Sequence, residues 1–331
     1  MKHVRMFFGS AAGLLAAFAF PLLASAHEVY VLTSPEVAEG LTTPAFSPWS
    51  VIAANPTQFL FWAGVGAILV FCIFFISTSR FLERLCAPTL IRLKPYAPMV
   101  ARITIGLSFL AAAYYQALFG PEIPLSVLFG SAAPLVTIIL LLVGVLLCIN
   151  RFGKIAALVA LCFFAAAAWR FGWYMLTYTN YFGELLIVAW LGIENRYSPL
   201  VLRFAFGTSM LYASLYAKFL HNDLALQVAS LPLAGHSGSL AAALGFEPHF
   251  LVLGAGIVEL VIGTFFLLGI EIRFTALFLE FWLTLSLLYF GEVVWPHIVL
   301  IGIPIALFLH GYDHYSLEGY FFKKRGREPV L

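Results

Sequence analysis

Residues 98–119 read PMVARITIGLSFLAAAYYQALF, and residues 199–220 read PLVLRFAFGTSMLYASLYAKFL. Aligned without a gap, the two stretches share eight identities in 22 positions. The identical pairs are Pro98/Pro199, Val100/Val201, Arg102/Arg203, Gly106/Gly207, Ser108/Ser209, Leu110/Leu211, Ala112/Ala213 and Tyr115/Tyr216. Chance similarity between apolar helices is the alternative. Shared proline, arginine, glycine and tyrosine arise less easily from composition bias than shared leucine or alanine, so we interpret the pattern as an internal repeat.

The ends of the two repeated units also resemble each other. Asn195-Arg196-Tyr197-Ser198 closes the first and Asp313-His314-Tyr315-Ser316 closes the second. We therefore expect two four-helix units in the same orientation, at 98–197 and 198–320, comparable to the parallel repeats of transporters.

The composition predicts an all-α membrane protein. Of the 331 residues, 62% are hydrophobic and only 10% are charged, whereas a soluble domain carries roughly 25% charged residues. So few charged residues cannot cover the surface of a water-soluble protein of this length. We therefore expect lipid to be its main solvent. The formal net charge of +2 argues against a nucleic-acid partner.

Nine apolar runs approach the about 20 residues that cross a hydrocarbon core. They lie near 57–77, 99–119, 126–149, 154–176, 180–196, 199–220, 249–270, 273–291 and 295–311. We expect a polytopic helical bundle with one leading helix and a basic cytoplasmic loop (57–97), followed by the two units.

Basic residues predict the orientation, because cytoplasmic loops are rich in Lys and Arg. Such residues follow the first run (Arg80, Arg84, Arg92, Lys94), separate later runs (Arg151, Lys154, Arg196, Arg203, Arg273) and end the chain (Lys323, Lys324, Arg325, Arg327). With nine spans, the mature N-terminus is periplasmic and the tail 321–331 is cytoplasmic.

The first 26 residues are typical of a bacterial signal peptide. Lys2 and Arg5 precede the apolar run 11–23, and Ala24-Ser25-Ala26 forms a cleavage site. An uncleaved anchor helix is the alternative. Residues 27–56 contain four prolines, and we expect an outer-face segment there rather than a folded domain.

The cysteines at 72, 86, 148 and 162 form no C-x-x-C pair. Neither a disulfide framework nor a thiol-redox motif is therefore indicated.

The second unit resembles the DoxX family of integral membrane proteins over about 198–320. The resemblance is carried by Leu202-Arg203, Gly207 and Lys218, by the helix Gly256-Ile-Val-Glu259-Leu260-Val-Ile-Gly263 with Leu267-Leu268-Gly269 and Arg273, and by the ending Tyr315-Ser316-Leu317-Glu318, where the family has Asp at the last position.

The resemblance implies a four-helix membrane fold. Some DoxX-like proteins resemble subunits of thiosulfate:quinone oxidoreductase, and others accompany redox enzymes, so the family does not define one reaction. This chain departs from the family in its signal peptide, its extra span and its degenerate first unit. By alignment, Glu259 falls opposite a small polar residue near Thr137, so the first unit lacks the acid.

Glu259 is the principal candidate for chemistry, because an ionised carboxylate near the bilayer centre costs several kcal/mol unless it is paired. Either it exchanges protons with a ligand such as a quinone, or it ties helices together by a hydrogen bond. We expect its partner among Ser209, Thr208, Tyr216, Arg203 and His297.

Glu280 is the second candidate carboxylate. It either pairs with Glu259 or bonds to Arg203 or a backbone carbonyl, and the latter is favoured. Glu259, Glu280 and Arg203 together form the predicted catalytic set.

Titratable residues gather near the outer end of the second unit. The candidates for cofactor binding are Lys218, His249, Glu292 and His297. The alternative is that they are ordinary polar residues of the membrane–water interface beside Trp295. An N-terminal His27 with His236 would suit copper through nitrogen ligands. At the outer end of the first unit, Arg170 and Glu184 are expected to pair.

Three functions stay open at this point. The first is a membrane subunit of a quinone-linked redox system, with sulfur compounds as one candidate substrate class, whose partner enzyme supplies the redox cofactor. The second is outer-face binding or transport of copper or a small anion. The third is a non-catalytic scaffold for exported enzymes.

Overall fold

The computed structural model describes residues 32, 34–77, 80–149, 151–191, 195–231, 239, 241–242, 245–290, 295–311, 313, 315–317 and 319–320. Apart from isolated bridges, such as that between Ala117 and Pro124, these residues contain helices, turns and loops and no strand. The predicted all-α class is therefore confirmed. The predicted signal peptide (1–26) and tail (321–331) lie outside the described residues.

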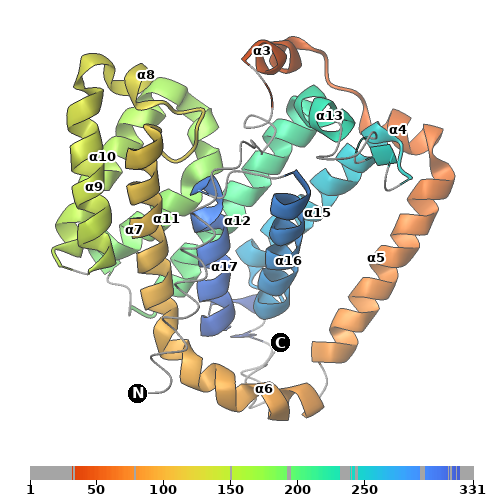
Figure 1. The fold of residues 1–331 in the computed structure, drawn as a ribbon. Helices are drawn as coiled ribbons and strands as arrows, with labels where there is room; N and C mark the ends of the chain where they lie inside the picture. The colour runs from red at the N-terminus through yellow and green to blue at the C-terminus, as the bar shows by residue number, and fades with distance from the viewer. Residues whose placement is uncertain are drawn as a thin grey trace.

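The N-terminal part forms two short helices and one long one (Figure 1). Helices α3 (Ser34–Thr42) and α4 (Pro48–Ala54) occupy most of the predicted outer-face segment. Helix α4 meets α5 (Pro56–Ser77) at a bend of 102°. Phe46, between α3 and α4, exchanges hydrogen bonds of 3.0 Å each with the side-chain amide of Asn222, so this segment is fixed to the second unit.

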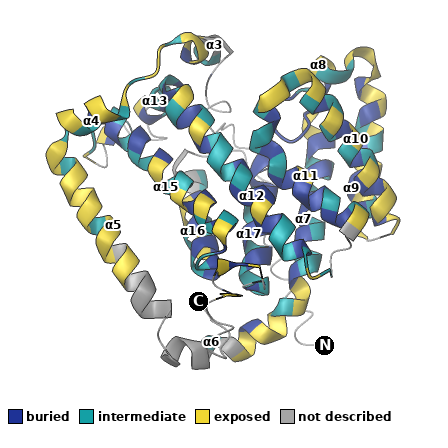
Figure 2. Ribbon diagram, turned by 180° about the vertical axis from the view of Figure 1, so that it is seen from behind, coloured by how far each residue is buried: buried dark blue, intermediate teal, exposed yellow. Residues whose placement is uncertain are grey.

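Helix α5 stands apart from the bundle. Its apolar side chains are largely exposed, as Figure 2 shows, with Leu60 at 70% and Phe71 at 68%. An apolar helix exposed over much of its length is not stable in water, and lipid is the solvent that suits it.

The predicted basic loop after α5 is instead a helix, α6 (Arg80–Leu93). It crosses the molecule from the end of α5 to the start of α7 (Figure 1). Leu90 is buried, while Ile91 on the same helix is exposed. The connection predicted between the first two spans therefore contains a helix, in which basic residues alternate with apolar ones and an amphipathic surface accommodates both.

The first unit contains α7 (Ala97–Tyr115), α8 (Leu125–Phe129), α9 (Ala133–Cys148), α10 (Gly153–Phe171) and α11 (Thr179–Leu186), which continues as the π-helical segment Ile187–Leu191. A 3-10 segment, Gly172–Tyr178, joins α10 to α11. The chain reverses there, since α11 and its π-helical extension pack back on α10.

The second unit contains α12 (Ser198–Ser214), which continues as the π-helical segment Leu215–Leu220, then α13 (Asn222–Ser230), α15 (Pro248–Leu268), α16 (Ile272–Phe290) and α17 (Ile298–His310).

The two units pack in the same order. Helix α7 packs on α9 as α12 packs on α15, and α10 packs on α11 as α16 packs on α17. Between the units, α11 lies against α12, and α17 lies against α7 (Figure 1). The last helix of each unit thus covers the first helix of the other, which is the arrangement of a pseudo-two-fold axis.

The helix contacts correspond residue by residue. A methyl group on Gly207 would lie 2.7 Å from the carbonyl oxygen of Gly263, and one on the equivalent Gly106 would lie 3.0 Å from that of Gly144. Small residues let these helix backbones approach closely, as in other membrane helix pairs.

Five helical runs within the described residues are long and apolar enough to cross a membrane, or six if the bent pair α4–α5 counts as one span. Four are Pro88–Tyr115, Leu125–Cys148, Ser198–Leu220 and Pro248–Leu268. The fifth, Gly153–Trp190, joins two of the expected runs through the 3-10 segment. Together these apolar helices identify a membrane protein.

Candidate functional site

Glu259 forms an ion pair inside the second unit. Its Oε2 lies 3.0 Å from the Nζ of Lys218, and the side chains are 14% and 8% exposed. Lys218 belongs to the π-helical end of α12, and Glu259 lies midway along α15. Because a charge in the apolar interior is costly when alone, each of these groups stabilises the other.

Close approach of α12 and α15 brings the two charges together. Ser214 donates a 3.0 Å hydrogen bond from its hydroxyl to the Gly256 carbonyl. A methyl group on Gly256 would meet the Lys218 Cβ at 3.1 Å and the Phe219 ring at 2.8 Å. The absence of a side chain at Gly256 therefore gives Lys218 its place beside α15.

Aromatic rings lie on the same π-helical segment. The Tyr216 ring is 4.7 Å from the His221 ring and 5.3 Å from the Tyr174 ring, centroid to centroid. Tyr212 stacks on Tyr216 at 6.2 Å. Tyr216 thus packs toward Tyr174 of the first unit, whereas Lys218, two residues later, faces Glu259 on α15.

The ion-pair partner of Glu259 is Lys218, which was not among its predicted partners. Ser209 donates to the Thr177 carbonyl, and Thr208 donates to the Phe204 carbonyl of its own helix. The sequence placed Lys218 near the outer face as a separate candidate and did not connect it with Glu259.

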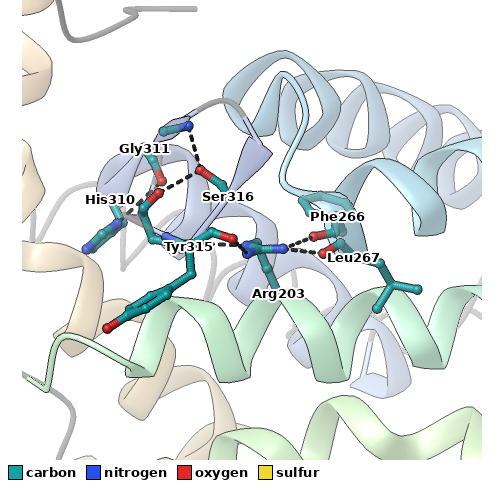
Figure 3. A network of polar contacts seen from close by, with 9 residues as sticks. Arg203, Phe266, Leu267, His310, Gly311, Tyr315 and Ser316 are labelled. Atoms are coloured by element: carbon teal, nitrogen blue, oxygen red, sulfur yellow. Dashed lines mark hydrogen bonds and ion pairs between the residues drawn. The ribbon is translucent and has the colours of Figure 1, made fainter. Parts of the chain in front are cut away.

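Arg203, a residue of α12, contacts the C-terminal end of α15. Figure 3 shows the network that it forms there. Its Nε is 2.7 Å from Asp313 Oδ2, and it donates to the carbonyls of Phe266, Leu267 and Tyr315. The side chain of Arg203 is 1% exposed. These contacts cap α15 and fix the turn after α17. They therefore give Arg203 a structural role. The catalytic role of Arg203 stays a prediction.

Arg102 makes the corresponding contacts in the first unit. It donates at 2.7 and 2.9 Å to the carbonyls of Leu147 and Cys148, the last residues of α9. No acid corresponds to Asp313, since Asn195 occupies that place in the repeated ending. Counting from these shared contacts, Glu259 corresponds to Leu140, which is fully buried. The predicted counterpart near Thr137 was therefore wrong by about one helical turn.

Glu280 on α16 bonds neither to Glu259 nor to Arg203, and its Oε1 atom bonds to no backbone carbonyl in the described part of the chain. Glu259 is paired with Lys218, and the bonds of Arg203 go to Asp313 and backbone carbonyls. The Oε1 atom of Glu280 is buried, and it has no hydrogen-bond partner in the described part of the chain. The predicted pairing was thus wrong, and the catalytic role of Glu280 stays a prediction.

The candidates for cofactor binding are dispersed. His249 Nδ1 lies 2.5 Å from Glu247 Oε1, and the second oxygen of Glu247 accepts from the Phe250 amide at the start of α15. Burial raises the pKa of the Glu247 carboxyl, but hydrogen bonds from His249 and the Phe250 amide outweigh it, and the net pKa is lowered. This pair therefore caps the helix. His297 is buried before α17, where neighbouring Trp295 stacks on Tyr115 of the first unit at 5.2 Å.

Three of the predicted ligands, Glu292, His236 and His27, lie outside the described residues. Within the residues that the structure describes, no cluster of three or more His, Cys, Asp or Glu could hold a metal ion. The copper hypothesis is therefore not tested by this geometry.

Glu184 does not pair with Arg170, contrary to expectation. Arg170 is exposed at the end of α10, whereas Glu184 is 2% exposed within α11. Both carboxylate oxygens of Glu184 are buried, and neither has a hydrogen-bond partner among the described residues. Sequence reasoning placed Glu184 at the start of a helix, and it therefore did not predict that this carboxyl is buried.

Comparison with known proteins gives no relative: no family model, no curated protein and no solved structure matches the chain.

Proposed function

We propose that the chain is an integral protein of the bacterial cytoplasmic membrane and the membrane subunit of a quinone-linked redox system. In this proposal α5 is a leading span, and two parallel four-helix units follow, giving nine spans with a periplasmic mature N-terminus and a cytoplasmic C-terminus. The exposed apolar surface of α5 and the matching contacts of the two units support this architecture. The DoxX resemblance of residues 198–320 belongs to the same proposal.

The Lys218–Glu259 ion pair is the observation that carries the functional part. The Lys218 ammonium is a donor for a quinone carbonyl, and the Glu259 carboxylate, after taking up a proton from the solution, can pass that proton to the reduced oxygen. Reduction to the quinol needs electrons as well as protons. The electrons come from the redox group of a partner subunit, and the protons enter through Glu259.

Exposed apolar residues show that α15 borders the apolar phase. Ile257 and Val261 are 44% and 45% exposed, and since each is two residues from Glu259 along the helix, they lie on the face opposite to it. A quinone dissolved in the bilayer can therefore reach α15, and in this proposal it reaches the ion pair through the 14% of the Glu259 side chain that is exposed.

The test is quinone binding to the purified protein in lipid nanodiscs. A short-chain benzoquinone is titrated while tryptophan fluorescence is followed, and empty nanodiscs correct for partition into lipid. Glu259→Gln and Lys218→Met each weaken binding at least about tenfold, because a hydrogen bond to a charged group contributes roughly 1.5–3 kcal/mol.

The matched control is Glu39→Gln, which removes an exposed carboxylate on α3. It leaves binding unchanged. Equal quenching in all four proteins would reject the proposed site and leave the chain as a scaffold for exported enzymes. Because loss of one partner leaves a buried charge, unfolding temperatures are compared to confirm that the variants are folded.

A further inference from the structure

A second buried carboxylate lies in the first unit, away from the Lys218–Glu259 pair. The oxygens of Glu184 are both buried, and within the described residues no side chain or amide bonds to them. One helical turn earlier, the Tyr181 hydroxyl is 2.8 Å from Ser108 Oγ and 3.3 Å from the Phe119 carbonyl. Tyr181 is thus already bonded and does not donate to Glu184.

Glu184 lines a cavity of about 40 Å³. By general cavity statistics this is room for roughly two or three water molecules. The cavity walls come from α7, from α11 and its π-helical extension, from α12 and from α17.

The cavity lies where the two units meet. Gly183 packs on Ala205 as Gly302 packs on the equivalent Thr104, and this correspondence makes several residues of the wall repeat-equivalent: Pro98 with Pro199, Ile187 with Ala306, and Val188 with Leu307. In membrane proteins built from repeats, ion and substrate sites are found at such interfaces. Glu184 is an exception to this equivalence. The separation in sequence that pairs Ile187 with Ala306 also pairs Glu184 with Ile303, which is apolar.

The charged and polar groups around Glu184 come from several helices. Arg102 on α7, Ser198 on α12 and His310 on α17 line the same cavity, and α10 contributes no residue to its wall. Arg102 donates to the Leu147 and Cys148 carbonyls. The charges of Lys94, Asp313 and Arg273 act on His310. These groups mark the end of the cavity near the starts of α7 and α12.

An ionised carboxylate with no donor is strongly disfavoured in this apolar surrounding. The protonated carboxyl is both donor and acceptor, and water in the cavity can satisfy it. We propose that Glu184 is a proton-binding site, which exchanges its proton with the solution at the Arg102–His310 end through this cavity. The proton arrives from hydronium at one carboxylate oxygen and leaves to water, and no other bond changes.

Infrared spectroscopy of the protein in nanodiscs tests this, through the C=O stretching band of protonated carboxylic acids. At neutral pH, Glu184→Gln loses the intensity of a single carboxyl relative to the wild type, and Glu184→Asp shifts that band instead of removing it. Glu39→Gln leaves the band unchanged. In the wild type the same band shifts on transfer to D₂O, because its proton exchanges.

Three results would overturn the proposal. They are an unchanged band in Glu184→Gln, a band that resists exchange in D₂O, and loss of the band on addition of Na⁺ at constant pH, which would identify a cation site. If Glu184→Gln does not fold, the Glu184→Asp shift and the D₂O exchange still decide. No quinone is present, so this test and the binding test at Glu259 fail independently.

Discussion

At the scale of the residue, the buried arginine of each unit has the clearest structural role. Arg203 satisfies carbonyls at the end of α15 and neutralises Asp313 in a site that excludes water. A lone arginine there would be costly, and so would the acid left behind after its removal.

We therefore expect Arg203→Met to destabilise the fold by about 3–5 kcal/mol, because it leaves Asp313 charged and unpaired. Thermal unfolding in detergent measures this as a lowered midpoint. Arg170→Met is the matched control, since Arg170 is exposed, and it leaves the midpoint almost unchanged. Equal midpoints for the two variants would mean that the Asp313 contact is not stabilising.

Sequence reasoning recognised that Glu259 needs a partner but did not identify Lys218. Lys218 lies four residues after Ser214 and eleven after Gly207, and both of these residues face α15, so regular helical spacing also places Lys218 on that face. The pair was missed because the sequence analysis placed Lys218 near the outer membrane face and Glu259 near the bilayer centre.

At the scale of the element, close backbone contact between paired helices determines the packing. A side chain at Gly207 would meet the backbone of α15, which cannot move aside as a flexible side chain can. Gly254 lies on α15 itself, and a methyl group there meets nothing within 4 Å.

Gly207→Ala is accordingly expected to destabilise the protein by about 1–3 kcal/mol, as overpacking does in other cores. Gly254→Ala is expected to be neutral or slightly stabilising, because alanine favours the helix. The unfolding midpoints of both variants in detergent test this pair. Similar effects at both positions would show that α12 and α15 do not approach as closely as described.

Helix positions followed well from the apolar runs, but breaks inside and between them did not. The run 126–149 is interrupted at Gly130, whose φ of 53° ends α8. Hydropathy does not detect such a break, because the residues around it stay apolar. The helix α6 within the predicted basic loop was likewise not detected, because its charges indicated exposure, and exposure does not exclude a helix.

At the scale of the whole molecule, the repeat explains the arrangement of the bundle. Equivalent contacts recur at Arg102 and Arg203 and at the paired glycines. The aligned stretches indicated two units, but no sequence pattern indicated that each last helix would cover the other unit. That arrangement creates the cavity between the units, and so the position of Glu184 was not predictable from spacing.

The two units differ in the position of their buried acidic residues. The second pairs Glu259 with Lys218, whereas the first holds Glu184 next to the cavity at the repeat interface. The first unit is therefore more than a scaffold in this account, although it lacks a counterpart of Glu259.

Photolabelling with an azido-quinone in nanodiscs, read by peptide mass spectrometry, tests the quinone site most directly. The account predicts label on the π-helical segment Leu215–Leu220 and on the middle of α15, competed by unlabelled quinone and lost in Glu259→Gln. Label confined to the lipid-exposed surface of α5, or label on α15 that excess quinone does not displace, would contradict it.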